Sequence, residues 1–406
     1  VGFRFTSNQL FWLTALPALS GATLRVFYSF MVPIFGGRRW TVISTLSLLL
    51  PAVGMGIALQ DSSTSYSTLL ILAALCGLGG GNFSSSMANI SFFYPKAKKG
   101  TATGLNAGIG NLGVSLAQFV VPLVISSAMV GSFTGEGLHY VEKGVEKTLW
   151  LQNAGFVWVP FIVISAILAW FGMNDIADAK ASFKDQAIIF RRKHNWLMCW
   201  LYVGTFGSFI GFSAGLALLT KSQFPDVNPT QYAFLGPLVG ALTRPVGGWI
   251  SDRLKAGATV TLYTFLLMVL GVVGVLFTLP SEGHAGNFPA FLGMFILLFA
   301  LSGIGNGSTF RMIPVIFLTA RTQEAEKTPE AQRQAVVQGN KEASAVLGFS
   351  GAVGAYGGFF IPKSFGTSLE ATGSVDMALY AFIAFYLSCM VVTWWFYARK
   401  GARTPC

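Results

Sequence analysis

The feature that most constrains this chain is a succession of apolar runs, each long enough to cross a lipid bilayer, separated by short polar breaks. A helix needs ~20 apolar residues to span the hydrocarbon core, and a helix satisfies its own backbone hydrogen bonds there. Nothing in the sequence alternates as a barrel strand does. We therefore expect an all-α membrane protein with eleven visible spans. They lie at about 8–35, 41–59, 67–94, 101–128, 150–173, 196–220, 231–251, 258–280, 288–319, 341–362 and 377–398.

The charged residues follow an alternating pattern along the chain. Of the 406 residues, 53% are hydrophobic and only 11% are charged, whereas roughly 25% are charged in an average soluble domain. The net charge of +11 would suit a nucleic-acid partner, but nineteen of the 27 Lys and Arg residues fall in alternate breaks and only four in the opposite ones. By the positive-inside rule the richer breaks face the cytoplasm. The basic balance therefore indicates orientation, and we expect no nucleic-acid binding.

This orientation predicts twelve spans in two halves. With the break around Arg38 and Arg39 cytoplasmic, residues 1–7 lie outside with no span before them, so we expect that the first of twelve spans is missing. A long charged break divides the remainder. The predicted division is an N-terminal helical bundle at 1–173, a cytoplasmic linker at 174–195 and a C-terminal helical bundle at 196–406.

Three motifs recur in the same order in both halves, at offsets of 219, 226 and roughly 241 residues. The matched stretches are 21–25 with 240–244, 77–79 (followed by Asn82 and Phe83) with 303–305 (followed by Asn306 and Phe310), and the glycine-rich run 104–113 with 348–358. Such a parallel repeat predicts the two related six-span bundles of the major facilitator superfamily.

Two arginines stand in mid-span, at matching places in the two halves. No carboxylate lies at the depth of Arg25 or Arg244, and a charge at the bilayer centre costs ~2.5–3.5 kcal/mol. We expect both to face a central cavity, with the substrate as the missing counter-charge, because paired N–H groups of a guanidinium match a planar oxyanion. The alternative is that each arginine bonds backbone carbonyls or extends to the interface. Arg311, late in its run, is expected to extend to the interface or to pair with a loop acid.

Asparagines interrupt the first glycine-rich run. Small residues every three or four positions let helices pack closely, which would account for most glycines in both runs. Asn111 differs because a buried amide needs a partner, and either the substrate or a carbonyl of another helix would supply it. Asn106 poses the same question more weakly. The glycines do not follow a nucleotide-binding pattern between a strand and a helix, so we expect no cofactor.

Two equivalent breaks carry glycines followed by basic residues. The stretch 247–253 ends in Asp252-Arg253 and resembles the loop signature of the major facilitator superfamily, whose charges latch neighbouring helix ends. The stretch 36–39 has no Asp before Arg38 and Arg39, so a latch in that half requires another partner.

Four longer stretches carry a closer resemblance: 20–30, 104–113, 205–213 and 347–359. They resemble the nitrate/nitrite porter family of that superfamily, and the similarity covers nearly the whole chain. The resemblance implies a central anion site between Arg25 and Arg244, in which Phe83 and Phe206 sandwich the planar anion and Tyr202 donates a hydrogen bond.

The expected function is therefore exchange of nitrate for nitrite by alternating access in the bacterial inner membrane. Proton-coupled nitrate symport is the alternative, and another small-oxyanion carrier is a more distant one. The sequence shows no nucleophile, acid pair or metal-ligand cluster, so we expect neither an enzyme nor a metal site. A channel fits the composition but does not account for the repeat. We expect a monomer whose partners are the two anions and the lipid bilayer.

Overall fold

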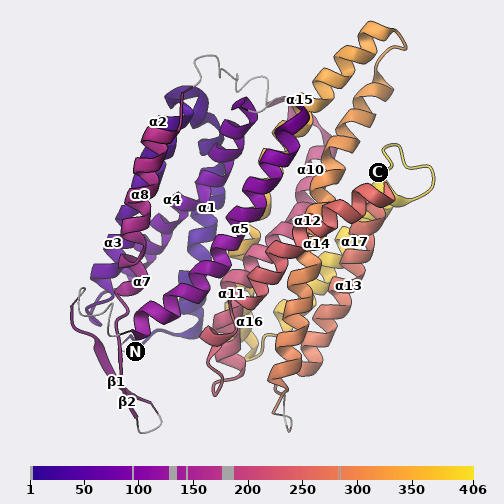
Figure 1. The fold of residues 1–406 in the computed structure, drawn as a ribbon. Coiled ribbons are helices and arrows are strands. Elements are labelled where there is room, and N and C mark those ends of the chain that lie inside the picture. The colour runs from indigo at the N-terminus through magenta and orange to yellow at the C-terminus, as the bar shows by residue number, and fades with distance from the viewer. Residues whose placement is uncertain are drawn as a thin grey trace. The chain divides into compact units, whose positions relative to one another are not determined.

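Long apolar helices make up most of the structure, a computed structural model that describes residues 3–93, 96–127, 135–142, 145–175, 187–281, 283 and 285–406 (Figure 1). The chain divides into two units: residues 1–180 with 228–234, and residues 181–227 with 235–406. Much of the linker expected at 174–195, namely 176–186, lies outside the described residues.

The first unit consists of helices and one small hairpin. Its two short strands pair antiparallel, with Leu138 opposite Leu149, in a break for which the sequence predicted no structure. The elements are α1 (Ser7–Phe35), α2 (Gly37–Leu46), α3 (Leu49–Ala58), α4 (Tyr66–Phe93), α5 (Lys96–Ser126), β1 (Leu138–Glu142), β2 (Val145–Leu149), α7 (Asn153–Phe156) and α8 (Trp158–Gly172).

The second unit is helical in its described residues. Two of its elements are π-helical turns within longer helical segments, and the short 3-10 helix η3 (Pro229–Gln231) belongs to the first unit. The elements are η1 (Ala187–Arg191), α10 (Lys193–Tyr202), η2 (Val203–Gly207), α11 (Ser208–Gln223), α12 (Leu235–Leu254), α13 (Gly257–Thr278), α14 (Phe288–Glu324), α15 (Pro329–Ala355), α16 (Gly357–Thr372), α17 (Asp376–Thr393) and η4 (Trp394–Ala398).

All eleven expected spans are helical in the described residues. Among the residues that the structure describes, ten segments are long and apolar enough to cross a membrane. The other expected span is α12, a helix of 20 residues that contains Arg244 and ends with Asp252 and Arg253, so it is less apolar than the rest. The prediction of an all-α membrane fold is confirmed.

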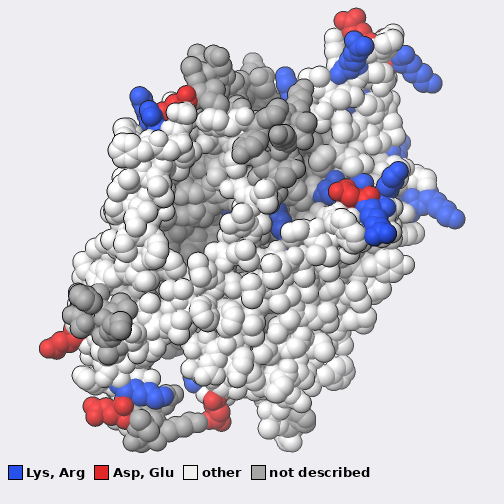
Figure 2. Space-filling view, in the orientation of Figure 1, with Lys and Arg blue, Asp and Glu red and all other residues white. Residues whose placement is uncertain are grey.

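The outer surfaces suit a lipid environment. Phe171 and Phe277 are 81% and 80% exposed, which would be costly in water but not against acyl chains. On the face drawn in Figure 2, most Lys, Arg, Asp and Glu side chains lie toward the ends of the helices. The apolar side chains therefore do more than fill a core: they also form the surface that meets the bilayer.

The first two repeat motifs pack against each other in both units. In α1, a Cβ added at Gly21 would lie 3.2 Å from the Gly80 Cα and 3.3 Å from the Gly77 carbonyl oxygen of α4. In α12 and α14, a Cβ added at Gly303 would collide with the Gly240 carbonyl. Backbones approach this closely only where side chains are absent.

A side-chain hydrogen bond accompanies each of these crossings. The Ser20 hydroxyl donates to the Ala74 carbonyl at 2.7 Å, and the Thr243 hydroxyl donates to the Ala300 carbonyl at 3.0 Å. The two carbonyls occupy equivalent repeat positions, three residues before the glycines at 77 and 303. The crossings α1–α4 and α12–α14 are therefore built alike.

The glycine-rich runs differ from this pattern and from each other. A Cβ at Gly108, Gly110 or Gly113 of α5 would meet no atom within 4 Å, whereas a Cβ at Gly357 would strike Gly207. Within the described residues, a close helix crossing therefore accounts for Gly357 but not for those three α5 glycines.

We expect Gly303→Ala to destabilise the protein, because the added methyl would press on backbone that cannot move aside. Overpacking of this kind costs about 1–3 kcal/mol. Gly108→Ala is the matched control: its methyl meets open space, and alanine favours a helix by about 1 kcal/mol over glycine. Thermal unfolding of the detergent-purified variants measures both, and equal melting temperatures would contradict the close crossing.

Candidate functional site

Arg25 is held inside the first unit, one helical turn beyond the crossing at Gly21. Its side chain is 8% exposed. The Nε donates a hydrogen bond to the Gly80 carbonyl of α4 at 3.0 Å, and the guanidinium carbon lies 4.8 Å from the centre of the Phe83 ring. Arg25 therefore makes a backbone-carbonyl contact of the kind that the sequence offered as the alternative. It also lies beside Phe83, the aromatic residue that the resemblance places at the anion site.

Arg244 has the same position in the second unit, one turn beyond Gly240, and is 7% exposed. Its Nη2 donates to the Tyr202 hydroxyl at 3.3 Å. The guanidinium carbon lies 5.4 Å from the centre of the Phe310 ring and 5.9 Å from that of Phe206. The Nη1 is buried and has no hydrogen-bond partner among the described residues. Arg244 thus offers a donor that the surrounding protein does not use.

The carboxylates that form ion pairs among the described residues do so with arginines other than Arg244. Asp175 pairs with Arg38 and Arg39, Asp252 with Arg311, Glu324 with Arg321, and Glu342 with Arg192 and Arg321. Among the described residues no carboxylate pairs with Arg244. In the described parts of the chain, the ring quadrupoles of Phe206 and Phe310 and the Tyr202 hydroxyl dipole offset this charge, which leaves it able to attract an anion.

A π-helical turn places Tyr202 and Phe206 beside Arg244. The turn η2 follows Tyr202 and contains Phe206, and the two ring centres lie 5.2 Å apart with a 32° tilt. In a regular helix, residues four apart lie on one face, and the wider π turn re-aims them, as is frequent at functional sites. Gly354 of α15 fits against both rings: a Cβ there would lie 2.8 Å from the Tyr202 Cδ1 and 3.2 Å from the Phe206 Cδ1. The ring positions therefore depend on a glycine in another helix.

Phe310 was not among the site residues predicted from the sequence. Its position after the 303–305 motif, where Phe83 follows 77–79, was the available signal. An intramembrane phenylalanine usually serves packing, so the sequence alone could not separate Phe310 from most of the other phenylalanines, whereas its contact with Arg244 does.

The two asparagines of α5 differ in their surroundings. The Asn106 Nδ2 donates to the Ser86 hydroxyl of α4 at 3.1 Å, so this amide has a partner on another helix. Asn111 is 9% exposed, and no hydrogen bond joins it to another residue in the described parts of the chain. Its assignment to the anion site stays a prediction.

Carboxylates pair with arginines near helix ends in both units. The Arg311 Nε donates to Asp252 at 2.9 Å, so Arg311 has the expected acid partner, although that acid lies in the last turn of α12 and not in a loop. In the first unit, Asp175 accepts a hydrogen bond from the Arg38 backbone at 2.8 Å and lies 3.6 and 3.7 Å from the Arg38 and Arg39 Nε atoms. Asp175 is therefore the substitute partner that this half required.

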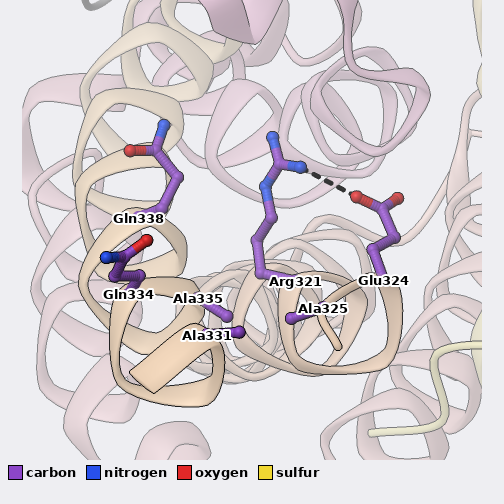
Figure 3. Close-up of a pocket in the computed structure, with 7 residues that line it drawn as sticks. All are labelled: Arg321, Glu324, Ala325, Ala331, Gln334, Ala335 and Gln338. Carbon is purple, nitrogen blue, oxygen red and sulfur yellow. Dashed lines mark hydrogen bonds and ion pairs between the residues drawn. The ribbon is translucent and has the colours of Figure 1, made fainter. Parts of the chain in front are cut away.

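A surface hollow on the α14–α15 hairpin offers no comparable anion site (Figure 3). Its guanidinium belongs to Arg321, which bonds Glu324 at 2.8 Å and also holds the buried carboxylate of Glu342. Gln338 and Arg192 donate to the same Glu342 carboxylate at 3.2 and 3.3 Å. In this cluster the positive charges already have carboxylate partners.

Comparisons with known proteins establish the family. The sequence model of the Major Facilitator Superfamily matches residues 2–362. The chain belongs to the major facilitator superfamily. This membership agrees with the multi-pass helical fold and with the repeated helix crossing. The prediction that the chain is a transporter and not an enzyme is confirmed.

Several named relatives match almost the full chain. The nitrate/nitrite transporter NarU of Escherichia coli is 51% identical over 98% of this chain and 86% of its own length, and NarU of Salmonella typhimurium is 50% identical over 99% and 86%. The probable nitrate/nitrite antiporter NarK2 of Thermus thermophilus is 43% identical over 100% and 87%.

A solved structure supports the fold alone. It is that of a bacterial homologue of the human lysosomal transporter Spinster, described as inward-facing and occupied. The TM-score is 0.57 at 13% identity, and the match covers 96% of this chain and 89% of the other.

We expect Glu342→Gln to lower stability markedly, because it removes the negative charge that Arg321 and Arg192 share at a 2% exposed position. Breaking a buried ion pair costs about 3–5 kcal/mol. The matched control is Glu324→Gln, which affects a partner that is 62% exposed and should cost under about 1 kcal/mol. Thermal unfolding compares the two, and similar losses would show that Glu342 contributes no more than a surface pair.

Proposed function

We propose that this chain exchanges nitrate for nitrite across the bacterial inner membrane, with one arginine from each half, Arg25 and Arg244, binding the anion. The observation that carries the proposal is the buried Nη1 of Arg244, a charged donor without a partner in the described residues. The equivalent position of Arg25 in the repeat and the names of the relatives support it.

The chemistry of this site suits a small planar anion. A guanidinium presents N–H groups in one plane, which match two oxygens of nitrate or nitrite. The faces of Phe83, Phe206 and Phe310 are apolar and flat, so they can cover the faces of a planar anion while the arginines bind its edge. A buried charge in low dielectric interacts more strongly than one in water, so the anion gains most where water is excluded.

The buried positive charges of Arg25 and Arg244 also favour obligatory exchange of one anion for another. In alternating access the carrier must change conformation around the central site, and without an anion it does so with buried positive charge uncompensated. Binding of either anion reduces this cost. The carrier should therefore return only when loaded, which links entry of one anion to exit of the other.

A proton-coupled mechanism would favour an acid that is able to take up and release a proton at depth. Glu342 is the deeply buried carboxylate of the described residues, and it is held by two arginines and Gln338. Its oxygens are therefore already engaged in an ion cluster with Arg192 and Arg321, a structural role that favours antiport over symport.

We expect Arg25→Lys and Arg244→Lys to reduce nitrate/nitrite exchange by about 10- to 100-fold, because lysine keeps the charge but not the planar pair of donors. The matched control is Arg311→Lys, which can still pair with Asp252 and should transport nearly normally. Initial exchange rates in proteoliposomes, normalised to inserted protein, measure the effect. Near-normal exchange in both site variants would remove Arg25 and Arg244 from the binding site.

We expect nitrate to enter nitrite-loaded proteoliposomes far faster than vesicles without an internal anion, since the unloaded carrier returns slowly. An imposed pH gradient should change neither rate appreciably. Rapid uptake into anion-free vesicles driven by the pH gradient would instead establish proton-coupled symport, and uptake that does not saturate would indicate a channel.

A further inference from the structure

The two arginine sites differ at one position of the helix that faces the guanidinium. The offset of 226 residues that matches 77–79 with 303–305 places Gly80 opposite Asn306. In the first unit this position supplies only a backbone carbonyl, which accepts the Arg25 Nε hydrogen bond at 3.0 Å. In the second unit it carries an amide side chain.

The contacts of α14 place Asn306 on the face against which Arg244 lies. The Phe310 ring centre is 5.4 Å from the Arg244 guanidinium carbon, and Asn306 precedes Phe310 by one turn, so both are on the same face of α14. At the intervening position, a Cβ on Gly307 would collide with the Arg244 carbonyl. Asn306 and Arg244 are therefore neighbours across the α12–α14 crossing.

Both side chains have an unused polar atom. The Asn306 Oδ1 and the Arg244 Nη1 are buried, and neither has a hydrogen-bond partner among the described residues. The side chains are 1% and 7% exposed. A buried acceptor and a buried donor on facing helices are costly when both are unpaired, so a conformation or a ligand that pairs them is favoured.

We propose that Asn306 is the exchangeable partner of Arg244. With no anion bound, the amide oxygen of Asn306 accepts a hydrogen bond from the guanidinium. With an anion bound, the amide turns over and its Nδ2 donates to the anion beside Arg244. An amide can do both because it carries a donor and an acceptor. This inference rests on the proposed exchange function and identifies a residue that controls it.

An amide at position 306 also explains why the carrier would still need a bound anion in order to return. Its oxygen satisfies the geometry of the guanidinium but carries no net charge, so the anion-free carrier still holds buried positive charge. A carboxylate at the same position would neutralise Arg244 permanently. The residue at position 306 therefore sets how readily the carrier can return without an anion.

Two near-isosteric variants separate these effects. Asn306→Asp keeps only the acceptor and adds a charge: we expect the KM for nitrate to rise at least about tenfold, and uptake into anion-free proteoliposomes to become a substantial fraction of the exchange rate. Asn306→Leu keeps neither group: we expect a severalfold rise in KM with no increase in anion-free uptake. Ser302→Ala, one turn earlier, changes a hydroxyl that bonds within its own helix and should match the parent.

Thermal unfolding in nitrate- and nitrite-free detergent buffer gives an independent test. A carboxylate that meets Arg244 should raise the melting temperature of Asn306→Asp above that of the parent, and added nitrate should no longer raise it further. A carboxylate buried without a partner would lower it strongly. A lower melting temperature for Asn306→Asp, or its failure to fold while Asn306→Leu folds, overturns the proposal, as does an unchanged KM for nitrate.

Different results would contradict the proposed function and the proposed role of Asn306. If the parent protein does not exchange nitrate for nitrite, the proposed function is wrong, and the unfolding comparison still tests the pairing of Arg244 with position 306. If the parent exchanges the anions and Asn306→Asp shows neither effect, only the role of Asn306 is wrong.

Discussion

The cost of holding a guanidinium inside a membrane protein determines how this structure is built. Arg25 and Arg244 are each more than nine-tenths buried, and each lies over an aromatic ring of the opposing helix. A long side chain can be enclosed in this way only if the two helices come close together. The glycine crossings provide that approach, because Gly21 and Gly240 stand one turn before the arginines and allow the opposing helix to reach them.

The two arginines are equally buried but differ in the group that accepts their hydrogen bond. The first unit gives Arg25 a backbone carbonyl, which is fixed by the helix it belongs to. The second gives Arg244 the Tyr202 hydroxyl, which can rotate, and the facing helix carries Asn306, whose buried Oδ1 has no hydrogen-bond partner among the described residues. The two units thus share the crossing but differ in the partner of the buried guanidinium, a backbone carbonyl in one and a side-chain hydroxyl in the other. If both arginines bind the anion as proposed, they need not have the same role in binding it.

The spans and the two central arginines could be predicted from the sequence because both depend on short-range information. Run length and charge position are read along the chain, and the absence of an acid near Arg25 or Arg244 needs no tertiary structure. Asp175 could not be assigned to Arg38 in this way, since 137 residues separate them. Phe310 and the π turn at 203–207 were missed for the same reason: their meaning depends on which face meets Arg244.

The glycines show why one residue type can have two explanations. Gly354 and Gly357 allow helices to approach the ring-bearing turn η2, whereas Gly108, Gly110 and Gly113 are open on the side that a Cβ would occupy. Sequence spacing is similar in the two runs, so spacing cannot separate them. The second run itself contains both cases, since a Cβ at Gly348 also meets no atom within 4 Å. A close helix crossing therefore explains Gly354 and Gly357, and the other glycines of the two runs have to be explained position by position.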